Sequence, residues 1–259
     1  MSAAFYLADG DRLVPTELTR GPWDPDAQHA GPPAALLGRA IERCEPVDGG
    51  QVGRITFEIL GPVPLEPLSV SARVVRPGRS VELIEASLSG PDGEVMRASA
   101  WRLRTREVAL DPEPPAEEPP LGPKHGRPGE FFPTGVDAGY HTGVEYRFVR
   151  GAFVESGPAT VWMRMRVPLV EGEEPSPLMR VLVVADSGNG VSATLDWRRF
   201  LFINTDLSVH LHRMPAGEWV CLDSVTYPEA SGIGLADTSL WDERGRIGRA
   251  AQTLLVRER

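Results

Sequence analysis

The feature that most constrains this chain is a proline-rich segment near its middle, between residues 107 and 139. It holds eight prolines: Pro112, Pro114, Pro115, Pro119, Pro120, Pro123, Pro128 and Pro133. Because proline lacks a backbone donor and has a fixed φ, such a segment cannot run through the interior of a sheet. We therefore expect an extended surface linker over 107–139. It would separate an N-terminal domain over residues 1–106 from a C-terminal domain over residues 140–259.

The two halves that flank the linker contain a weak internal repeat. The first half carries Gly93-Glu-Val-Met-Arg97-Ala98-Ser-Ala100, and the second carries Gly245-Arg-Ile-Gly-Arg249-Ala250-Ala-Gln252. In each case a turn with glycine leads into a strand with arginine and alanine at the same offsets. Each half also has one helix candidate upstream of this strand, followed by several strand candidates. Together these correspondences favour a duplication.

Each half is predicted to contain one main helix. The first covers about residues 32–44, where proline suits the first turn and Leu37, Ile41 and Cys44 recur on one face. The second covers 176–187, with Ser176 as N-cap and Gly188 at the place where a left-handed residue ends many helices. This second segment is apolar nearly all round, which predicts a helix enclosed by a sheet.

Most of the remaining chain alternates between apolar and polar residues. The pattern is clear over 68–74, 161–167 and 207–211, with residues such as Trp162 in the positions that alternate with the apolar ones. A period of two is typical of half-buried antiparallel strands. One buried helix followed by antiparallel strands, occurring twice, predicts an α+β fold in which each sheet wraps a helix.

Charge and composition exclude several classes of function. The formal net charge of −9 argues against a nucleic-acid partner, which needs a basic surface. There is no run of about 18 apolar residues, so membrane insertion is not expected. The N-terminus lacks the features of a signal peptide, and Cys44 and Cys221 are far apart, so we expect reduced, buried thiols in a cytoplasmic protein.

Four segments together resemble one known family. They are Gln28-His29-Ala30-Gly31-Pro-Pro-Ala-Ala-Leu-Leu, Val75-Arg76-Pro-Gly-Arg79-Ser80, Phe202 to Arg213, and Gly245 to Gln252. In order and spacing they are similar to segments of the double hot-dog acyl-CoA thioesterases of the bacterial type II and related actinobacterial kind. The resemblance covers nearly the whole chain and implies two tandem hot-dog domains. It also implies an acyl-CoA or related thioester as partner, with a homodimer or higher oligomer compatible with the fold.

The resemblance further implies a set of site residues. Members of the family hold a water between an Asp after the second central helix, a Thr at the next motif and a Gln on the last strand. These positions correspond to Asp186, Asn204 and Gln252, so an asparagine stands where the family has threonine, with Thr205 beside it. Gly31, Thr205 and Arg79 are the corresponding substrate-binding candidates. No cofactor and no metal are implied.

These residue types suit thioester hydrolysis without a covalent intermediate. Asp186 can deprotonate a water that the amides of Asn204 and Gln252 orient, and N–H groups at a helix start, around Gly31 or Ser176, can polarise the carbonyl. There is no Gly-x-Ser-x-Gly motif to support a serine hydrolase.

Simpler interpretations of the same residues remain open. Asp186 can accept hydrogen bonds in a capping turn, from the N–H of Gly188 or Asn189, and Gln252 can bond a neighbouring strand. Asn204 and Asp206 are expected to share a strand face with His210 and His212, which allows a metal site, although a solvated face is the more common reason for such a pattern.

Three functions are compatible with the sequence: a thioesterase, a non-catalytic acyl- or acyl-CoA-binding protein with a degenerate site, and a hot-dog hydratase. The third has the least support, because neither 24–31 nor 168–176 contains an Asp-x-Asn-x-x-His motif.

Overall fold

The computed structural model describes residues 4–259 except 113–116, 130 and 132–134, so parts of the predicted linker lie outside the described residues. Its longer helices are α1 (Gly31–Arg43) and α3 (Pro177–Ala185), and its short helices are η1 (Glu17–Thr19), η2 (Pro123–His125), α2 (Tyr140–Gly143) and α4 (Gly188–Val191). The strands of the N-terminal half are β1 (Tyr6–Asp9), β2 (Arg12–Pro15), β3 (Gly50–Ile59), β4 (Leu68–Arg76), β5 (Val81–Gly90) and β6 (Gly93–Arg104). Those that follow are β7 (Arg127–Pro128), β8 (Val144–Arg150), β9 (Ala159–Met165), β10 (Phe200–Asn204), β11 (Asp206–Leu211), β12 (Val220–Pro228), β13 (Ile233–Asp242) and β14 (Gly245–Glu258).

The strands form one continuous antiparallel sheet whose order reflects the internal repeat. The N-terminal half contributes β2-β4-β5-β6-β3, and the C-terminal half continues with β11-β14-β13-β12-β9. The two halves join where β3 pairs with β11, from Asp206↔Glu58 to His210↔Arg54. Each half therefore has the same arrangement about this junction, and the strands with the repeated sequence, β6 and β14, occupy equivalent places. The predicted repeat is present in the fold.

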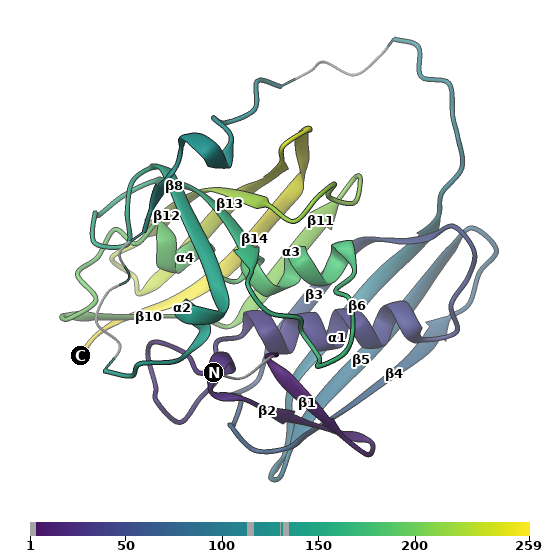
Figure 1. Ribbon diagram of the computed structural model, residues 1–259, viewed down its shortest axis with the longest axis horizontal. Helices are drawn as coiled ribbons and strands as arrows, with labels where there is room; N and C mark the ends of the chain where they lie inside the picture. The colour runs from purple at the N-terminus through teal and green to yellow at the C-terminus, as the bar shows by residue number, and fades with distance from the viewer. Residues whose placement is uncertain (1–3, 113–116, 130, 132–134) are drawn as a thin grey trace.

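The two long helices lie side by side inside the curve of this sheet and run antiparallel (Figure 1). The start of α1 meets the end of α3, because a Cβ on Gly31 would collide with the carbonyl oxygen of Val183. At the other end, the Oγ of Ser176 donates to Glu42 Oε2 at 2.6 Å. Ser176 also caps α3, as predicted, by accepting from the N–H of Met179. Glycine at position 31 thus permits the close contact between the helices.

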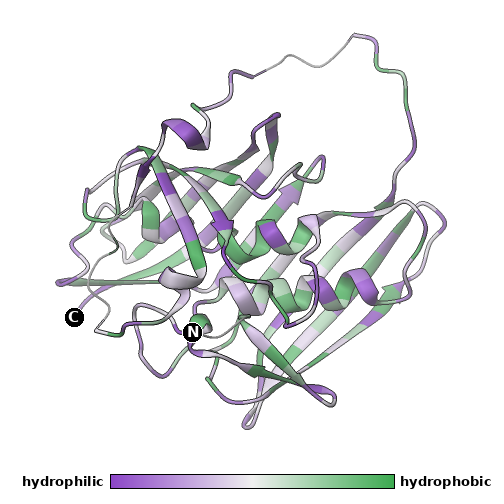
Figure 2. Cartoon of the chain, in the orientation of Figure 1, coloured by the Kyte–Doolittle hydropathy of each residue, from purple (hydrophilic) through white to green (hydrophobic). Residues whose placement is uncertain are grey.

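A single hydrophobic core fills the space between the helices and the inner face of the sheet. It contains buried side chains from both halves, among them Leu37 and Ile41 of α1 and Leu182 of α3. Figure 2 shows the strands coloured in alternating green and purple, as expected when one face of a sheet covers a core. Burial of this apolar surface is the main favourable contribution to folding.

The linker region passes over the outside of the sheet. It arches away from the body after β6 (Figure 1), and β7 then pairs with β8 at the edge of the sheet. Trp162, which alternates with the inward-facing apolar residues of β9, is buried as well. The carbonyl oxygen of Leu121 accepts a 2.7 Å hydrogen bond from its Nε1, and Cys221 and Trp241 pack against it. The linker region therefore covers this side chain on the outer face of the sheet.

A break between β10 and β11 changes which way the site residues face. The two strands lie end to end along β14, and Asn204 pairs with Leu254, which points inward. Thr205 interrupts the ladder, so that Asp206 points away from the core, on the same side as Ser208. The prediction that Asn204 and Asp206 share a face is therefore wrong, because one extra residue reverses the alternation.

Two smaller expectations also need correction. Gly188 begins α4 and does not adopt a positive φ. Glycine is required there because a Cβ would lie 2.6 Å from Thr238 Oγ1 and 3.1 Å from Gln252 Oε1. Both cysteines are free thiols, but Cys44 is only half-buried. None of the described helices is both long and apolar enough for a membrane span.

Candidate active site

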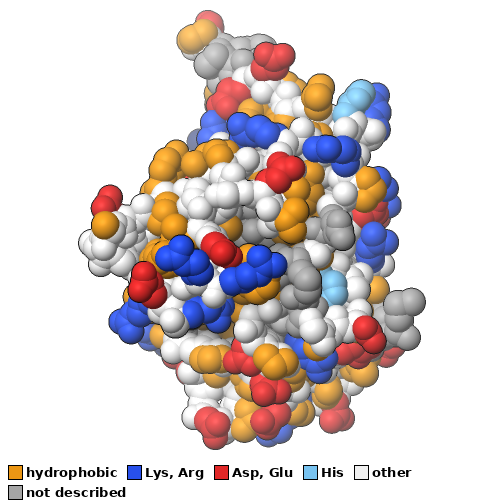
Figure 3. All heavy atoms as spheres, turned by 90° about the vertical axis from the view of Figure 1, so that its left-hand side faces the viewer, with side chains coloured by type: hydrophobic (Ala, Val, Ile, Leu, Met, Phe, Trp, Pro, Cys, Tyr) orange, Lys and Arg blue, Asp and Glu red, His pale blue; other side chains and the backbone are white. Residues whose placement is uncertain are grey.

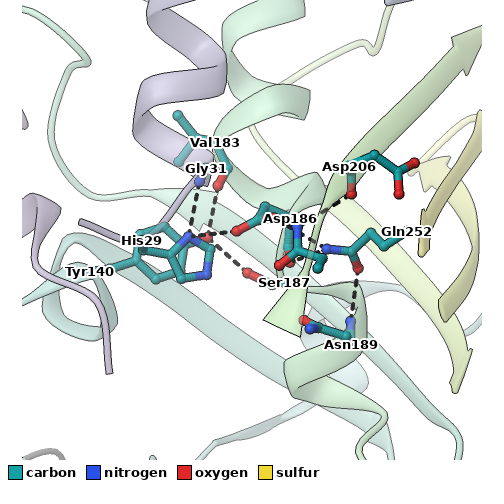
Figure 4. Close-up of polar contacts among 10 residues, drawn as sticks. His29, Gly31, Tyr140, Val183, Asp186, Ser187, Asn189, Asp206 and Gln252 are labelled. Atoms are coloured by element: carbon teal, nitrogen blue, oxygen red, sulfur yellow. Dashed lines mark hydrogen bonds and ion pairs between the residues drawn. The ribbon is translucent and has the colours of Figure 1, made fainter. Parts of the chain in front are cut away.

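The carboxylate of Asp186 lies where α3 ends and is buried between the helix and the sheet. Its Oδ1 accepts a 2.8 Å hydrogen bond from Nδ2 of Asn204. It also accepts a 3.2 Å hydrogen bond from Nε2 of Gln252 (Figure 4). The structure therefore brings together the three residues predicted for catalysis. Both amides donate to the carboxylate itself, so they fix its orientation.

Gln252 is held by contacts on both sides of its amide. Nε2 also donates to the backbone oxygen of Asp186 at 3.0 Å, and Oε1 accepts the N–H of Asn189 at 3.1 Å. Alternation along β14 turns this side chain inward, where it is 2% exposed. The N–H of Asn189 thus donates to Gln252 and not to Asp186. The interpretation in which Asp186 accepts this N–H in a capping turn is therefore wrong. A buried amide with this many partners is a rigid support for the carboxylate.

His29 is a site residue that the sequence interpretation did not select. It precedes α1, and its Nδ1 lies 3.3 Å from Oδ2 of Asp186, the carboxylate oxygen that the amides leave free. The same Nδ1 accepts the N–H of Gly31 at 3.0 Å. Burial lowers the pKa of His29 below its ordinary value, although the nearby Asp186 carboxylate acts in the opposite direction.

Tyr140 holds the His29 ring in place and was also missed. The two rings are stacked with centroids 3.7 Å apart and planes inclined by 9°. The Tyr140 hydroxyl donates to the carbonyl oxygen of Val183 at 2.8 Å and lies 3.0 Å from Ser187 Oγ. Burial raises the pKa of Tyr140, so the phenol is neutral. No sequence signal identifies it, because it belongs to a short helix directly after the linker.

A cavity of about 450 Å³ opens next to Asp186 and His29. Its lining is mostly apolar, with Trp23, Leu60 and Ile203 at exposed positions and the rings of Phe131, Tyr146 and Phe153 deeper in the protein. Figure 3 shows the side of the molecule on which β10 and the C-terminus lie, with hydrophobic patches between arginines and acidic side chains. A concave apolar pocket with a few convergent polar groups is the usual form of a small-molecule site.

The three candidate substrate-binding residues are placed very differently. Thr205 lines the cavity beside Asn204. Gly31 is buried and is not among the lining residues, but its N–H points to Nδ1 of His29, which does line the cavity. Arg79 is exposed in the turn between β4 and β5 and is not among the lining residues. His210 and His212 line a separate surface hollow with Arg246 and Arg249.

The outer face of the N-terminal half carries a larger hollow of about 590 Å³. Its lining includes Glu58, Arg73, Glu85 and Arg97, and none of the site residues described above. Arg73 and Glu85 already form an ion pair there at 2.9 Å. Its position on the solvent side of the sheet separates it from the carboxylate, so we assign the candidate site to the smaller cavity.

Within the described part of the chain, the opposite end of the two helices does not repeat this arrangement of a carboxylate and two amides. Ala100 on β6 corresponds to Gln252 on β14. Nearby, the buried Arg102 guanidinium donates to the carbonyl oxygens of Cys44 at 2.8 Å and Glu45 at 2.9 Å, and it pairs with Glu82 at 2.8 Å. The end of α1 is therefore occupied by an arginine where the end of α3 has its carboxylate.

One antiparallel sheet that wraps two antiparallel central helices, with a polar site where the helices meet, defines a double hot-dog protein of α+β class. Comparison of sequences gives the family. Residues 109–256 match the family model described as the acyl-CoA thioesterase C-terminal domain, and residues 19–103 match the acyl-CoA thioesterase N-terminal domain. The chain belongs to the acyl-CoA thioesterase family, which confirms both the predicted fold class and the resemblance.

Solved structures show the same fold over nearly the whole chain. A hot-dog protein of unknown function from Alicyclobacillus acidocaldarius has 16% identity and a TM-score of 0.73, with 97% of this chain and 95% of that chain covered. A protein assigned as a thioesterase, from Novosphingobium aromaticivorans, has 22% identity and a TM-score of 0.71, covering 97% and 98%. An acyl-CoA thioesterase II from Mycobacterium marinum has 15% identity and a TM-score of 0.63, covering 90% of each chain. No curated protein matches the sequence significantly.

Proposed function

We propose that this protein hydrolyses an acyl-CoA thioester with a water that Asp186 deprotonates. The observation that carries the proposal is the geometry of one buried carboxylate. Two amides from the paired strands β10 and β14 hold its Oδ1 at 2.8 and 3.2 Å, and its Oδ2 faces the cavity residue His29. A carboxylate fixed in this way beside an apolar cavity is suited to act as a general base.

The reaction needs no covalent intermediate. Asp186 takes a proton from water as the water oxygen attacks the thioester carbonyl, and the carbonyl oxygen becomes an oxyanion. Donors are required for this oxyanion, and N–H groups at a helix start, around Gly31 or around Ser176, are the predicted ones. Gly31 is the candidate beside His29, whereas Ser176 lies at the opposite end of the two helices, against Glu42. The C–S bond then breaks, and the sulfur leaves as a thiolate that takes up the proton. Water and thioester are thus converted into a carboxylic acid and a thiol.

Asn204 replaces the threonine of the family pattern without loss of a donor. Its Nδ2 donates to Oδ1 of Asp186, a bond that a threonine hydroxyl can also make. The break at Thr205 turns Asn204 inward and so allows this contact. This is why we favour a working site over a degenerate one.

The acyl chain would occupy the apolar part of the cavity. Phe131, Tyr146 and Phe153 form an aromatic cluster there, with centroids of Phe131 and Phe153 4.4 Å apart and those of Tyr146 and Phe153 5.0 Å apart. Transfer of an acyl chain to such a surface contributes about 0.8 kcal/mol per methylene. An acyl-CoA substrate would give the protein a role in lipid metabolism. The location in the cytoplasm and a homodimer or higher oligomer stay predictions.

Thiol release from a panel of acyl-CoA substrates tests the proposal. We expect the wild-type protein to be active and Asp186→Asn to lose at least about 10²-fold in kcat. Asp237→Asn, at a half-buried position of β13 away from the cavity and paired with Arg249, is the matched control and should keep wild-type activity. Equal rates for wild type and Asp186→Asn would refute the catalytic assignment.

The same experiment decides the alternative function. Oδ1 of Asp186 already has two donors, which is the one observation that favours a site for binding without turnover. In that case calorimetry would show acyl-CoA binding while no thiol is released by the wild-type protein.

A further inference from the structure

The Nδ1 atom of His29 has two partners that require opposite hydrogen-bonding states. It accepts the N–H of Gly31 at 3.0 Å, for which its lone pair must be free. It also lies 3.3 Å from Oδ2 of Asp186, and a carboxylate attracts this atom only when a proton lies between them. A neutral imidazole nitrogen either donates or accepts, so Nδ1 cannot satisfy both contacts at once.

The surroundings keep the ring in this place and keep it neutral. Tyr140 stacks on its face at 3.7 Å, and the residue lies between the start of α1 and the end of α3 (Figure 4). Burial lowers the pKa of His29. The resting state therefore has an unprotonated Nδ1 that accepts from Gly31, and Oδ2 of Asp186 can share a proton with it once Asp186 has taken one from water.

We propose that His29 is a positioning residue that shares the proton which Asp186 takes from water and thereby releases the N–H of Gly31 for the oxyanion. This inference rests on the proposed hydrolysis. When a proton arrives on Oδ2, it bonds to Nδ1, whether it remains on the carboxyl or moves to the imidazole. In both states the Nδ1 lone pair is engaged, and the N–H of Gly31 loses its acceptor.

The coupling makes the N–H of Gly31 available as a donor in the step in which the oxyanion forms. The oxyanion forms in the same step in which water loses its proton to Asp186. The freed N–H, at the start of a thirteen-residue helix, then has a negative partner in the tetrahedral intermediate. When the C–S bond breaks, the proton returns through Oδ2 to the thiolate, and Nδ1 accepts from Gly31 again. Atoms and charges balance over the cycle, and no further reactant is required.

His29→Asn separates this role from a purely structural one. An asparagine places an oxygen or an NH2 group at the position of Nδ1, so it can accept from Gly31 or donate to Asp186, but it cannot take up a proton. We expect kcat to fall by about 10²-fold. KM should change by less than about twofold, since the lost interaction exists only in the transition state. His210→Asn, the same change at an exposed position of β11, should have no effect.

The pH profile gives a second readout that a structural role does not move. The ionisable groups around His29 in the cavity are Asp186, Tyr140, Tyr146 and Asp24. In the wild type, Nδ1 of His29 must be unprotonated, so protonation of the imidazole should steepen the acid limb of log kcat/KM. In His29→Asn this contribution should be absent, so the acid limb should be shallower by the slope that one proton contributes. Nitrogen NMR of the resting wild-type protein should show His29 with Nδ1 unprotonated.

The possible outcomes separate this inference from the proposed function. Suppose that the wild type is active and that His29→Asn is folded, with a normal kcat and an unchanged acid limb of its pH profile. This result would overturn the role of His29 and leave the hydrolase assignment intact. A resting proton on Nδ1 in the NMR spectrum would overturn it as well, even if the variant did not fold. An inactive wild type would overturn both.

Discussion

Replacing Gln252 by glutamate tests whether its amide supports Asp186. The two side chains have nearly the same size, but the substitution puts an oxygen in place of Nε2. That oxygen would lie about 3.0 Å from the backbone oxygen of Asp186 and about 3.2 Å from its Oδ1. Both native contacts depend on the donor, so the variant needs a proton between the two carboxyl groups.

The magnitude follows from the distance. Two unit charges 3.2 Å apart repel by about 5 kcal/mol at an effective dielectric constant of about 20. This energy corresponds to a rise of about three to four pH units in the apparent pKa at which the carboxyl pair loses its shared proton. Burial of both positions, 2% and 5% exposed, acts in the same direction, because it disfavours the charged forms.

The stability of Gln252→Glu should fall as the pH rises, whereas most carboxylates in folded proteins stabilise the fold as the pH rises. The folded-state pKa of the pair is raised above the unfolded value of about 4.3, so the folded protein holds the extra proton more tightly. We expect Gln252→Glu to match the wild type in stability near pH 4 and to lose up to about 5 kcal/mol as the pH rises through the raised pKa. Activity should persist while the pair holds one proton and be lost when that proton dissociates.

Guanidinium unfolding and thiol release, each measured between pH 4 and 9, check this prediction. Gln51→Glu, the same change on β3 away from Asp186, is the control and should track the wild type at every pH. The reasoning fails if the difference in unfolding free energy between Gln252→Glu and the wild type is independent of pH.

Three further predictions concern other parts of the molecule. Arg102→Lys should lower the free energy of unfolding by about 1–3 kcal/mol, because one ammonium cannot serve Glu82 and the carbonyls at the end of α1, while kcat of the folded enzyme is unchanged. Burial alone raises the pKa of Asp242, but hydrogen bonds from Arg213 and two backbone N–H groups outweigh it, so the pKa is lowered. The stability difference between wild type and Asp242→Asn should therefore shrink as the pH falls through that lowered pKa, which urea unfolding at several pH values measures. Phe153→Ala, at the aromatic end of the cavity, should shift the preferred acyl chain to a greater length and change relative kcat/KM values by about tenfold or more, as measured with acyl-CoAs of increasing length.

The broad architecture was predictable from the sequence because its signals are local. Ser176 and Pro177 mark the start of α3, and the repeated strand segments fall on β6 and β14. The division of the chain at a proline-rich linker stays a prediction. Each signal depends on the chemistry of neighbouring residues, so it persists in any tertiary context. The burial of Trp162 is different, because it depends on a linker contact from 41 residues away.

The site was predictable only in part. Asp186, Asn204 and Gln252 came from a resemblance between sequences, and the structure brings them together. The inward orientation of Asn204 depends on one extra residue at the strand break, which an alternating pattern does not reveal. His29 belongs to the other half, and its place beside Asp186 follows from the antiparallel packing of α1 and α3.

The duplicated fold also explains why the site occurs at one end only. Two equivalent positions exist where the halves meet. One lies at the start of α1, the end of α3 and strand β14, and the other at the start of α3, the end of α1 and strand β6. Where α3 ends, Gly188 and Gln252 leave room for a buried carboxylate and provide its donors. Where α1 ends, Ala100 provides no amide, and Arg102 satisfies the carbonyl oxygens directly. A cation that caps a helix C-terminus stabilises it, whereas an anion there, such as Asp186, is unfavourable unless other donors compensate for it. Stability therefore favours the arginine end, and the carboxylate end depends on the hydrogen bonds that Asn204 and Gln252 donate to Asp186.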